Sequence, residues 1–193
     1  MIRSLIFFVI FLFASASFAQ VSSDVIYNFF ASHPEYYSDG FDFPVGKPDA
    51  KKYYNAQPFQ KNNHLGDDWN GTGGGNSDLG DAVFSCANGY VVFAENIGGG
   101  WGNVVRVVHV VSENPLILVE SLYAHLHEIE TQIGPIKRGV QLGTIGNAGG
   151  IYWAHLHLEI RTEYGLPIGG GYSDITTGYA DPTKFIKANR PIK

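Results

Sequence analysis

The chain has 193 residues, a formal net charge of −5 and an aromatic content of 14%. A mildly acidic chain without a basic stripe argues against nucleic-acid binding. The single cysteine, Cys86, excludes an internal disulfide and a cysteine-rich zinc site. Because it lies in an apolar run, we expect Cys86 to be a small buried side chain.

The first residues have the three parts of a secretory signal peptide. Arg3 belongs to a basic start, an apolar run extends from Leu5 to Phe13, and Ala19 ends a small-residue site. We therefore expect cleavage after Ala19, with residues 1–19 as the signal peptide and export to the periplasm or the medium. A membrane anchor is the alternative, but the apolar run is shorter than the roughly 20 residues of a spanning helix.

The remaining length suits one domain, which we place at residues 46–190, behind a lead segment at residues 20–45. Within the lead segment, Asp24–Phe30 predicts a short helix, and the Phe and Tyr side chains are expected to pack onto the domain. Further on, Asp49–Tyr54 indicates one or two helical turns.

From residue 82 onward the pattern indicates a mainly β domain. Runs rich in Val, Ile and aromatic residues predict strands at Val83–Cys86, Tyr90–Glu95, Asn103–Val111, Leu116–Tyr123 and Trp153–Arg161. The short connections favour antiparallel pairing. Asn88-Gly89 predicts a tight hairpin turn between the first two strands. Asp181 and Pro182 predict the N-cap and first turn of a helix.

The stretch Ala154–Ile160 alternates polar and apolar residues like a strand. His155, His157 and Glu159 would then lie in one row, because side chains two apart on a strand share a face. Imidazole is a common zinc ligand, so this row indicates a metal site if other donors join it. Glu159 would then either orient a ligand imidazole or be an ordinary strand carboxylate.

Two upstream stretches carry further histidines: His64-Leu65-Gly66-Asp67-Asp68 and Tyr123-Ala124-His125-Leu126. Together with His155-Leu156-His157 they resemble the lysostaphin-like (LytM-type) zinc endopeptidases, whose His-x-x-x-Asp, isolated His and His-x-His patterns occur in this order. The resemblance covers about half of the chain. It implies the duplicated hybrid motif fold, a compact antiparallel β-sheet sandwich or barrel-like domain with few short helices and a site in a groove across one sheet.

The resemblance assigns three zinc ligands, His64, Asp68 and His157, for one Zn²⁺ per chain. Two imidazoles and a carboxylate are suitable donors for a catalytic zinc that keeps a fourth position open. The residues alone do not decide between neighbouring carboxylates, and we expect Asp67 to be a solvated loop charge. The resemblance further makes His125 and His155 the proton-transfer pair, with their individual roles open.

The function implied by the resemblance is an exported zinc metalloendopeptidase that hydrolyses peptide bonds in peptidoglycan cross-links or bridges by zinc-activated water. We expect a monomer whose partners are peptidoglycan peptides, with no nucleic acid and no stable membrane insertion after signal cleavage. Two alternatives stay open. One is a catalytically silent module that binds cell wall or activates a partner hydrolase, and the other is a peptidase that acts on extracellular proteins.

The chain departs from the family before the first motif, where Asn55–Phe59 replaces a common Ser-x-Phe-Gly-x-Arg stretch. The shape of the groove therefore stays open there. Two Gly-rich loops, residues 70–80 and 163–178, form either groove walls or plain connections. Five aromatic residues near the motifs either pack in the core or line the groove, and we expect at least one of them to contact substrate: Trp69, Trp101, Tyr123, Tyr152 and Trp153.

Three histidines and one asparagine near these motifs have less certain roles. His127 could share the strand face of His125. His109 and His33 are expected to be structural, and Asn103 to fix a Gly-rich turn.

Overall fold

The computed structural model describes residues 21–191. The predicted signal peptide and its cleavage site after Ala19 lie outside the described residues. Within residues 21–191, no helix has the length and apolar character needed to cross a membrane.

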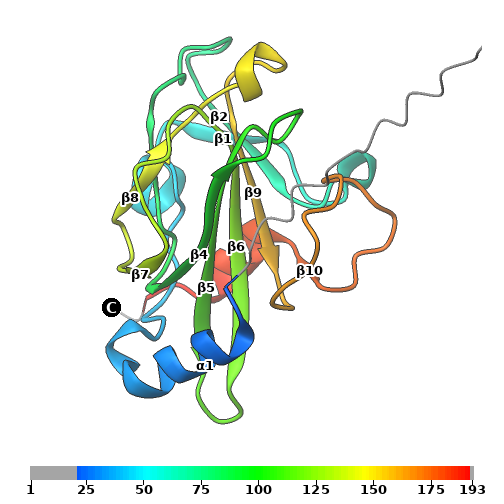
Figure 1. Cartoon of the computed structure of the whole chain (residues 1–193). Coiled ribbons are helices and arrows are strands. Elements are labelled where there is room, and N and C mark those ends of the chain that lie inside the picture. Colours follow the sequence, from blue (N-terminus) through cyan, green and yellow to red (C-terminus); the bar gives the residue numbers. More distant parts are fainter. Residues whose placement is uncertain (1–20, 192–193) are drawn as a thin grey trace, which may run out of the picture.

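Strands dominate the described part of the chain (Figure 1). The strands are β1 (Tyr53–Gln57), β2 (Asp67–Gly71), β3 (Ala82–Phe84), β4 (Gly89–Asn96), β5 (Asn103–Ser112), β6 (Ile117–Leu126), β7 (Gly134–Ile136), β8 (Gln141–Thr144), β9 (Leu156–Arg161) and β10 (Tyr179–Ala180). The helices are α1 (Ser23–Ser32) and α2 (Pro182–Ala188), with short helical turns at Pro34–Tyr36, Gly46–Ala50, Lys61–Asn63 and Ala148–Gly150.

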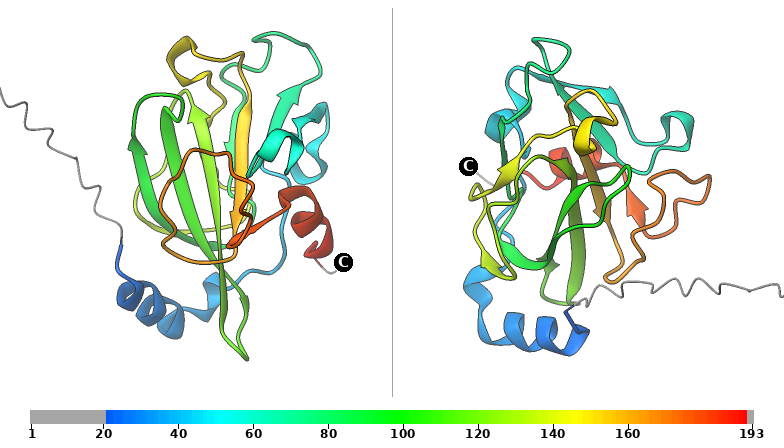
Figure 2. Two further views of the ribbon diagram at one scale, coloured as in Figure 1. Left: turned by 90° about the vertical axis from the view of Figure 1, so that its right-hand side faces the viewer. Right: turned by 45° about the horizontal axis from the view of Figure 1, so that its top comes forward.

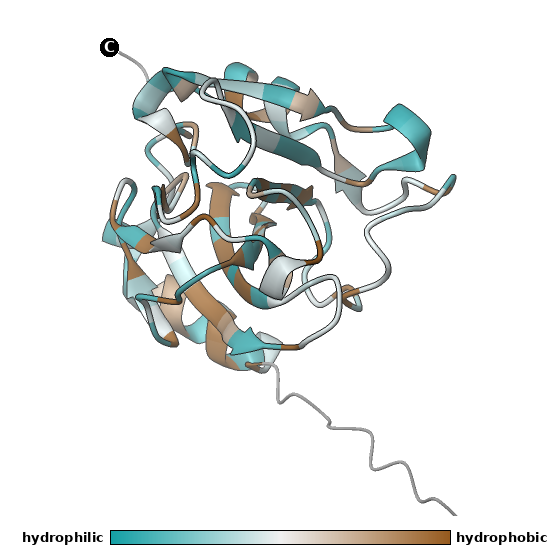
Figure 3. Cartoon of the chain, turned by 90° about the horizontal axis from the view of Figure 1, so that it is seen from above, coloured by the Kyte–Doolittle hydropathy of each residue, from teal (hydrophilic) through white to brown (hydrophobic). Residues whose placement is uncertain are grey.

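The strands form one large and one small sheet. The large sheet has the order β1-β2-β9-β6-β5-β4-β7, with β10 added to β9, and the small sheet pairs β3 with β8. Every pairing is antiparallel. A core of Val, Leu, Ile and aromatic side chains includes residues of both sheets, and Figure 3 shows the hydrophobic residues concentrated on the strands. The predicted mainly β, antiparallel fold is therefore confirmed.

The lead segment packs against strands β4 and β5 of the large sheet (Figures 1 and 2). Its helix α1 begins after Ser22, whose side chain accepts a hydrogen bond from Val25 N. Ile26 and Phe30 are fully buried, in one cluster with Val92 and Val108. The predicted helix and the packing of the lead segment are confirmed.

The helical turns expected at Asp49–Tyr54 are only partly present. A helical turn spans Gly46–Ala50, but the chain is extended from Tyr53, where β1 begins. Strand β1 pairs with β2, and this pairing outweighs the local preference.

The predicted hairpin at Asn88-Gly89 is wrong. Strand β3 pairs with β8, whereas β4, which begins at Gly89, pairs with β5 and β7. The Asn88 side chain instead bonds Tyr37 O and Arg138 N. Glycine is needed next to it for close packing, since a Cβ at Gly89 would lie 2.3 Å from the carbonyl oxygen of Val108.

The C-terminal helix α2 begins as predicted. The Asp181 carboxylate accepts a hydrogen bond of 2.9 Å from Lys184 N, and Pro182 is the first helical residue. Cys86 is also fully buried, as expected.

Candidate metal centre and active-site groove

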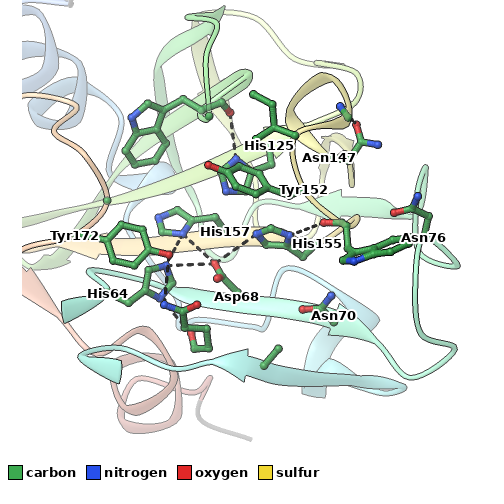
Figure 4. A pocket seen from close by; sticks show the side chains of 18 of the residues that line it. His64, Asp68, Asn70, Asn76, His125, Asn147, Tyr152, His155, His157 and Tyr172 are labelled. Carbon is green, nitrogen blue, oxygen red and sulfur yellow. Dashed lines mark hydrogen bonds and ion pairs between the residues drawn. The ribbon is translucent and has the colours of Figure 1, made fainter. Parts of the chain in front are cut away.

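Two adjacent strands bring three candidate ligands together (Figure 4). Antiparallel pairing of β2 with β9 places Asp68 opposite His157, and His64 lies just before β2. His64 Nε2 lies 2.9 Å from His157 Nδ1 and 3.3 Å from Asp68 Oδ1. His157 Nδ1 lies 3.0 Å from the same Asp68 oxygen.

A glycine permits this approach of the strands. Gly66 lies between His64 and Asp68, and a Cβ there would come within 2.5 Å of Leu158 O and 2.8 Å of His157 Cε1. Real Cβ atoms do not come so close to other atoms, so a side chain at this position would displace His157.

The second nitrogen of each histidine fixes its tautomer. His64 Nδ1 donates to the carbonyl oxygen of Gln57 (3.1 Å), and His157 Nε2 donates to Glu159 Oε1 (3.2 Å). Both partners are acceptors, so in the neutral rings His64 Nε2 and His157 Nδ1 are the nitrogens whose lone pairs can bind a cation beside Asp68 Oδ1. Such ligand histidines typically donate their other N–H to a carboxylate or carbonyl.

These three donor atoms fit a zinc ion. Ligands at ~2.0–2.1 Å around a tetrahedral zinc are about 3.3 Å apart, close to the 2.9–3.3 Å found here. Without a cation, burial opposes a charge on His157, but hydrogen bonds with Asp68 and Glu159 outweigh it and raise the pKa of His157 to about 9. Burial would also raise the pKa of Asp68, yet hydrogen bonds from His157 and His64 hold it well below its usual range. The centre thus favours a positive charge.

Two further histidines lie beside this centre (Figure 4), His155 just before β9 and His125 on the neighbouring strand β6. His155 Nδ1 donates to Trp153 O (2.8 Å), which leaves Nε2 free, 3.7 Å from Asp68 Oδ1. His125 Nδ1 donates to Trp101 O (3.4 Å). Burial, together with neighbouring His157 and His155, lowers the pKa of His125 to about 3, so this imidazole is neutral at neutral pH. The structure therefore brings all five residues singled out from the sequence into one site.

The five residues line a cavity of about 850 Å³. Asn70 lies at the end of β2, Asn76 comes from the first Gly-rich loop that follows it, and Gly170, Gly171 and Tyr172 come from the second. Both loops therefore form groove walls. The described residues that line the cavity include no Lys or Arg.

The expectation that Asp67 is a solvated loop charge is wrong. Asp67 is fully buried, with Oδ1 accepting from Phe59 N (2.9 Å) and Oδ2 from Thr183 N (3.0 Å) and Thr183 Oγ1 (2.6 Å). Alternation along β2 turns Asp67 away from the groove and toward α2, whereas Asp68 faces the candidate metal centre. The packing of α2 against this strand could not be read from the local sequence.

The aromatic residues divide between the groove and the core. Trp101, Tyr152 and Trp153 line the cavity, and Trp153 is 71% exposed. Trp69 and Tyr123 are buried core residues, and Tyr123 OH accepts a hydrogen bond from Cys86 N. The position of an aromatic residue near a motif therefore did not by itself indicate contact with the groove.

The other histidines do not line the groove. His125 has a positive φ of 62°, which interrupts the strand alternation, so the exposed His127 does not share its face. His109 is buried and donates to Asn88 O (2.8 Å), and His33 is exposed beside Glu35. Asn103 donates to Leu126 O and His127 O, so it fixes the turn as expected.

Sequence reasoning missed several groove residues: Gln57, Asn70, Asn76, Asn147 and Tyr172. Asn70 had a signal, since it lies two residues after Asp68 on the same strand face. Asn70 donates to Ala154 O (3.1 Å), and Asn76 accepts from Ala154 N (2.8 Å). These two amides therefore hold the residue that precedes His155. Tyr172, whose ring centroid lies 5.0 Å from that of His64, had no local signal.

Parts of this chain are similar in sequence to known proteins. The DD-carboxypeptidase/endopeptidase Mpg of Neisseria meningitidis is 34% identical over 89 residues, which cover 46% of this chain and 19% of Mpg. The lipoprotein NlpD of Yersinia enterocolitica is 34% identical over 83 residues, 42% of this chain and 78% of NlpD. This chain therefore matches only a small part of Mpg.

The fold is also found in solved structures. The catalytic domain of the prophage-encoded M23 protein EnpA from Enterococcus faecalis, crystallised as a mutant, has a TM-score of 0.51 at 21% identity and covers 74% of this chain and 95% of that one. Residues 67–169, more than half of the chain, match the model of Peptidase family M23. The chain therefore belongs to Peptidase family M23, a family of zinc peptidases.

Proposed function

We propose that this protein is an exported zinc metalloendopeptidase that hydrolyses peptide bonds in peptidoglycan, with residues 46–190 as its peptidase domain. One observation carries the proposal. Three ligand atoms converge on one point, and two further imidazoles line the same cavity beside that point. This is the arrangement needed for metal-assisted hydrolysis with proton transfer.

The zinc would be held by His64, Asp68 and His157. When bound, it supplies Lewis acidity, which activates water and polarises the amide carbonyl. Gln57 and Glu159 keep the two ligand imidazoles in the tautomers that leave a lone pair for the ion.

His125 and His155 serve as the proton-transfer pair. Backbone carbonyl oxygens hold the Nδ1–H of each ring, so Nε2 is the atom that exchanges protons. With His125 neutral at neutral pH, the pair takes a proton from the attacking water and delivers one to the leaving amine.

The groove favours internal bonds over a C-terminal residue. A carboxypeptidase has to hold the free carboxylate of its substrate, and Arg or Lys is the usual partner for that charge. The described lining contains neither and instead offers amide and aromatic side chains. Of the two activities in the name of Mpg, this supports the endopeptidase.

The test is incubation of the zinc-loaded mature protein with purified peptidoglycan, with His125→Ala alongside. We expect new amino groups from the wild type only and, by mass spectrometry, fragments cut at internal peptide bonds. Release of single C-terminal residues would contradict the endopeptidase assignment. Absence of amines from a folded, zinc-loaded protein would contradict the peptidoglycan activity. A casein digest and a pull-down with intact cell wall would then separate a protein substrate from a silent binding module.

N-terminal sequencing of the exported protein, expected to begin at Gln20, tests the cleavage site.

A further inference from the structure

A buried row of charged side chains leads away from the candidate metal centre. Glu159, Arg161 and Glu120 are fully buried, and Arg106 is 5% exposed. Arg161 Nε donates to Glu159 Oε2 (2.8 Å), and Arg161 Nη1 lies 3.7 Å from Glu120 Oε1. Arg106 donates to both oxygens of Glu120, at 2.8 and 2.9 Å. Each charge therefore has an opposite partner, as buried charges require.

One end of this row of charges contacts the candidate zinc ligand His157. The other carboxylate oxygen of Glu159, Oε1, accepts the Nε2–H of His157 at 3.2 Å. Glu159 thus uses one oxygen for the ligand imidazole and the other for Arg161. A shift of Arg161 would move the carboxylate that orients His157.

The other end of the row contacts the second Gly-rich loop, which crosses the outer face of the large sheet (Figure 2). Arg161 Nη1 donates to Leu166 O and Pro167 O, each at 3.3 Å, and Nη2 donates to Ile168 O at 3.0 Å. A few residues later the same loop lines the groove with Gly171 and Tyr172. Arg161 therefore contacts both the loop that forms a groove wall and the carboxylate that holds His157.

Arginine is suited to this position for a geometric reason. Its planar guanidinium presents five N–H donors in a fixed fork, and here donors on three nitrogens reach one carboxylate and three carbonyl oxygens. A lysine has one nitrogen and cannot reach both ends at once. The charge alone would therefore not replace the fork.

We infer that Arg161 is a positioning residue that couples the Leu166–Ile168 segment, which precedes the groove-lining residues 170–172 in the same loop, to the candidate zinc ligand His157. Order at one end then favours order at the other, so zinc affinity and loop rigidity rise and fall together. The inference rests on the ligand set proposed above.

The test combines zinc affinity with hydrogen exchange in the wild type and in Arg161→Lys, at one pH and without substrate. Zinc affinity is measured by competition with a chelator, and exchange is followed in peptides that cover residues 163–168. We expect Arg161→Lys to bind zinc about 10-fold more weakly, the lower end of the range for loss of an outer partner, because Glu159, the outer partner of His157, loses the donor that fixes it. We also expect zinc to slow exchange in this segment in the wild type and to lose that effect in the variant.

The matched control is Arg138→Lys, which breaks another forked contact, to Asp39, at the lead segment. It should leave both readouts unchanged. Zinc affinity of Arg161→Lys within about two-fold of wild type would overturn the inference, even with a looser loop, since the loop would then not be coupled to His157. If Arg161→Lys does not fold, Glu159→Gln decides by the same criterion. A wild type that binds no zinc would instead refute the proposed function.

Discussion

The substitution Asp67→Asn separates the roles of two neighbouring carboxylates. Asp67 accepts three hydrogen bonds in a fully buried position, one from Phe59 N and two from Thr183. An asparagine keeps one acceptor oxygen but turns an NH₂ group toward the donors that the second oxygen served. The substitution therefore removes support for the start of α2 without touching the groove.

The expected cost follows from these contacts. A hydrogen bond to a charged group contributes about 1.5–3 kcal/mol, and a buried donor left unpaired costs a similar amount. We expect Asp67→Asn to lower the free energy of unfolding by about 3 kcal/mol. For a domain of this size that corresponds to a fall in melting temperature of about 6–12 °C.

The assay is denaturant unfolding in the presence of a chelator, with zinc binding measured separately on the folded protein. Thr183→Ala, which removes the Oγ1 donor to the carboxylate, should cost about 1.5–3 kcal/mol, and its effect should not add fully to that of Asp67→Asn. The adjacent Asp68→Asn is the matched control for metal binding, since it should lose the zinc that Asp67→Asn retains. Unchanged stability of Asp67→Asn, or loss of zinc from it, would refute the reasoning.

Three further predictions concern other parts of the molecule. Burial lowers the pKa of His109 to about 4, against ~6.5 in an unfolded chain. The contribution of neutral His109 to stability is therefore complete above pH ~6.5 and falls by about 3 kcal/mol as the pH drops toward 4. Unfolding of His109→Gln should depend less on pH over this range, and an unchanged dependence would contradict this prediction. Asn76→Ala removes the acceptor for Ala154 N, next to His155. It should lower kcat about 10-fold with zinc retained, because a misplaced catalytic group lowers the rate. An unchanged kcat would show that the amide does not position His155. Phe30→Ala should lower the free energy of unfolding by about 3–5 kcal/mol. It should leave the activity of the folded protein unchanged, since Phe30 packs in a cluster that contains no groove-lining residue. A lower activity per folded molecule would show that the lead segment shapes the site.

Much of the site could be predicted from the sequence because its residues follow local spacing rules. His155 and His157 share a strand face at a separation of two residues, and the family resemblance supplied the rest of the set. Helix α2 was also predictable, since Asp181 and Pro182 are local signals for a helix start.

What the sequence did not reveal depends on contacts between distant segments. The orientation of Asp67 is set by Thr183, 116 residues away in the chain. Tyr172 reaches the groove because its loop folds back beside His64, with which it forms an isolated bridge. The local turn signal at Asn88-Gly89 was misleading because β3 joins another sheet.

The central claim is that His64, Asp68 and His157 hold the metal while His125 and His155 move protons. The measurement that tests it most directly is the zinc content per folded chain of the wild type, His157→Ala and His125→Ala after identical loading and washing. We expect one zinc in the wild type and in His125→Ala, and none in His157→Ala. Zinc retained by His157→Ala, or lost from His125→Ala as completely as from His157→Ala, would contradict it.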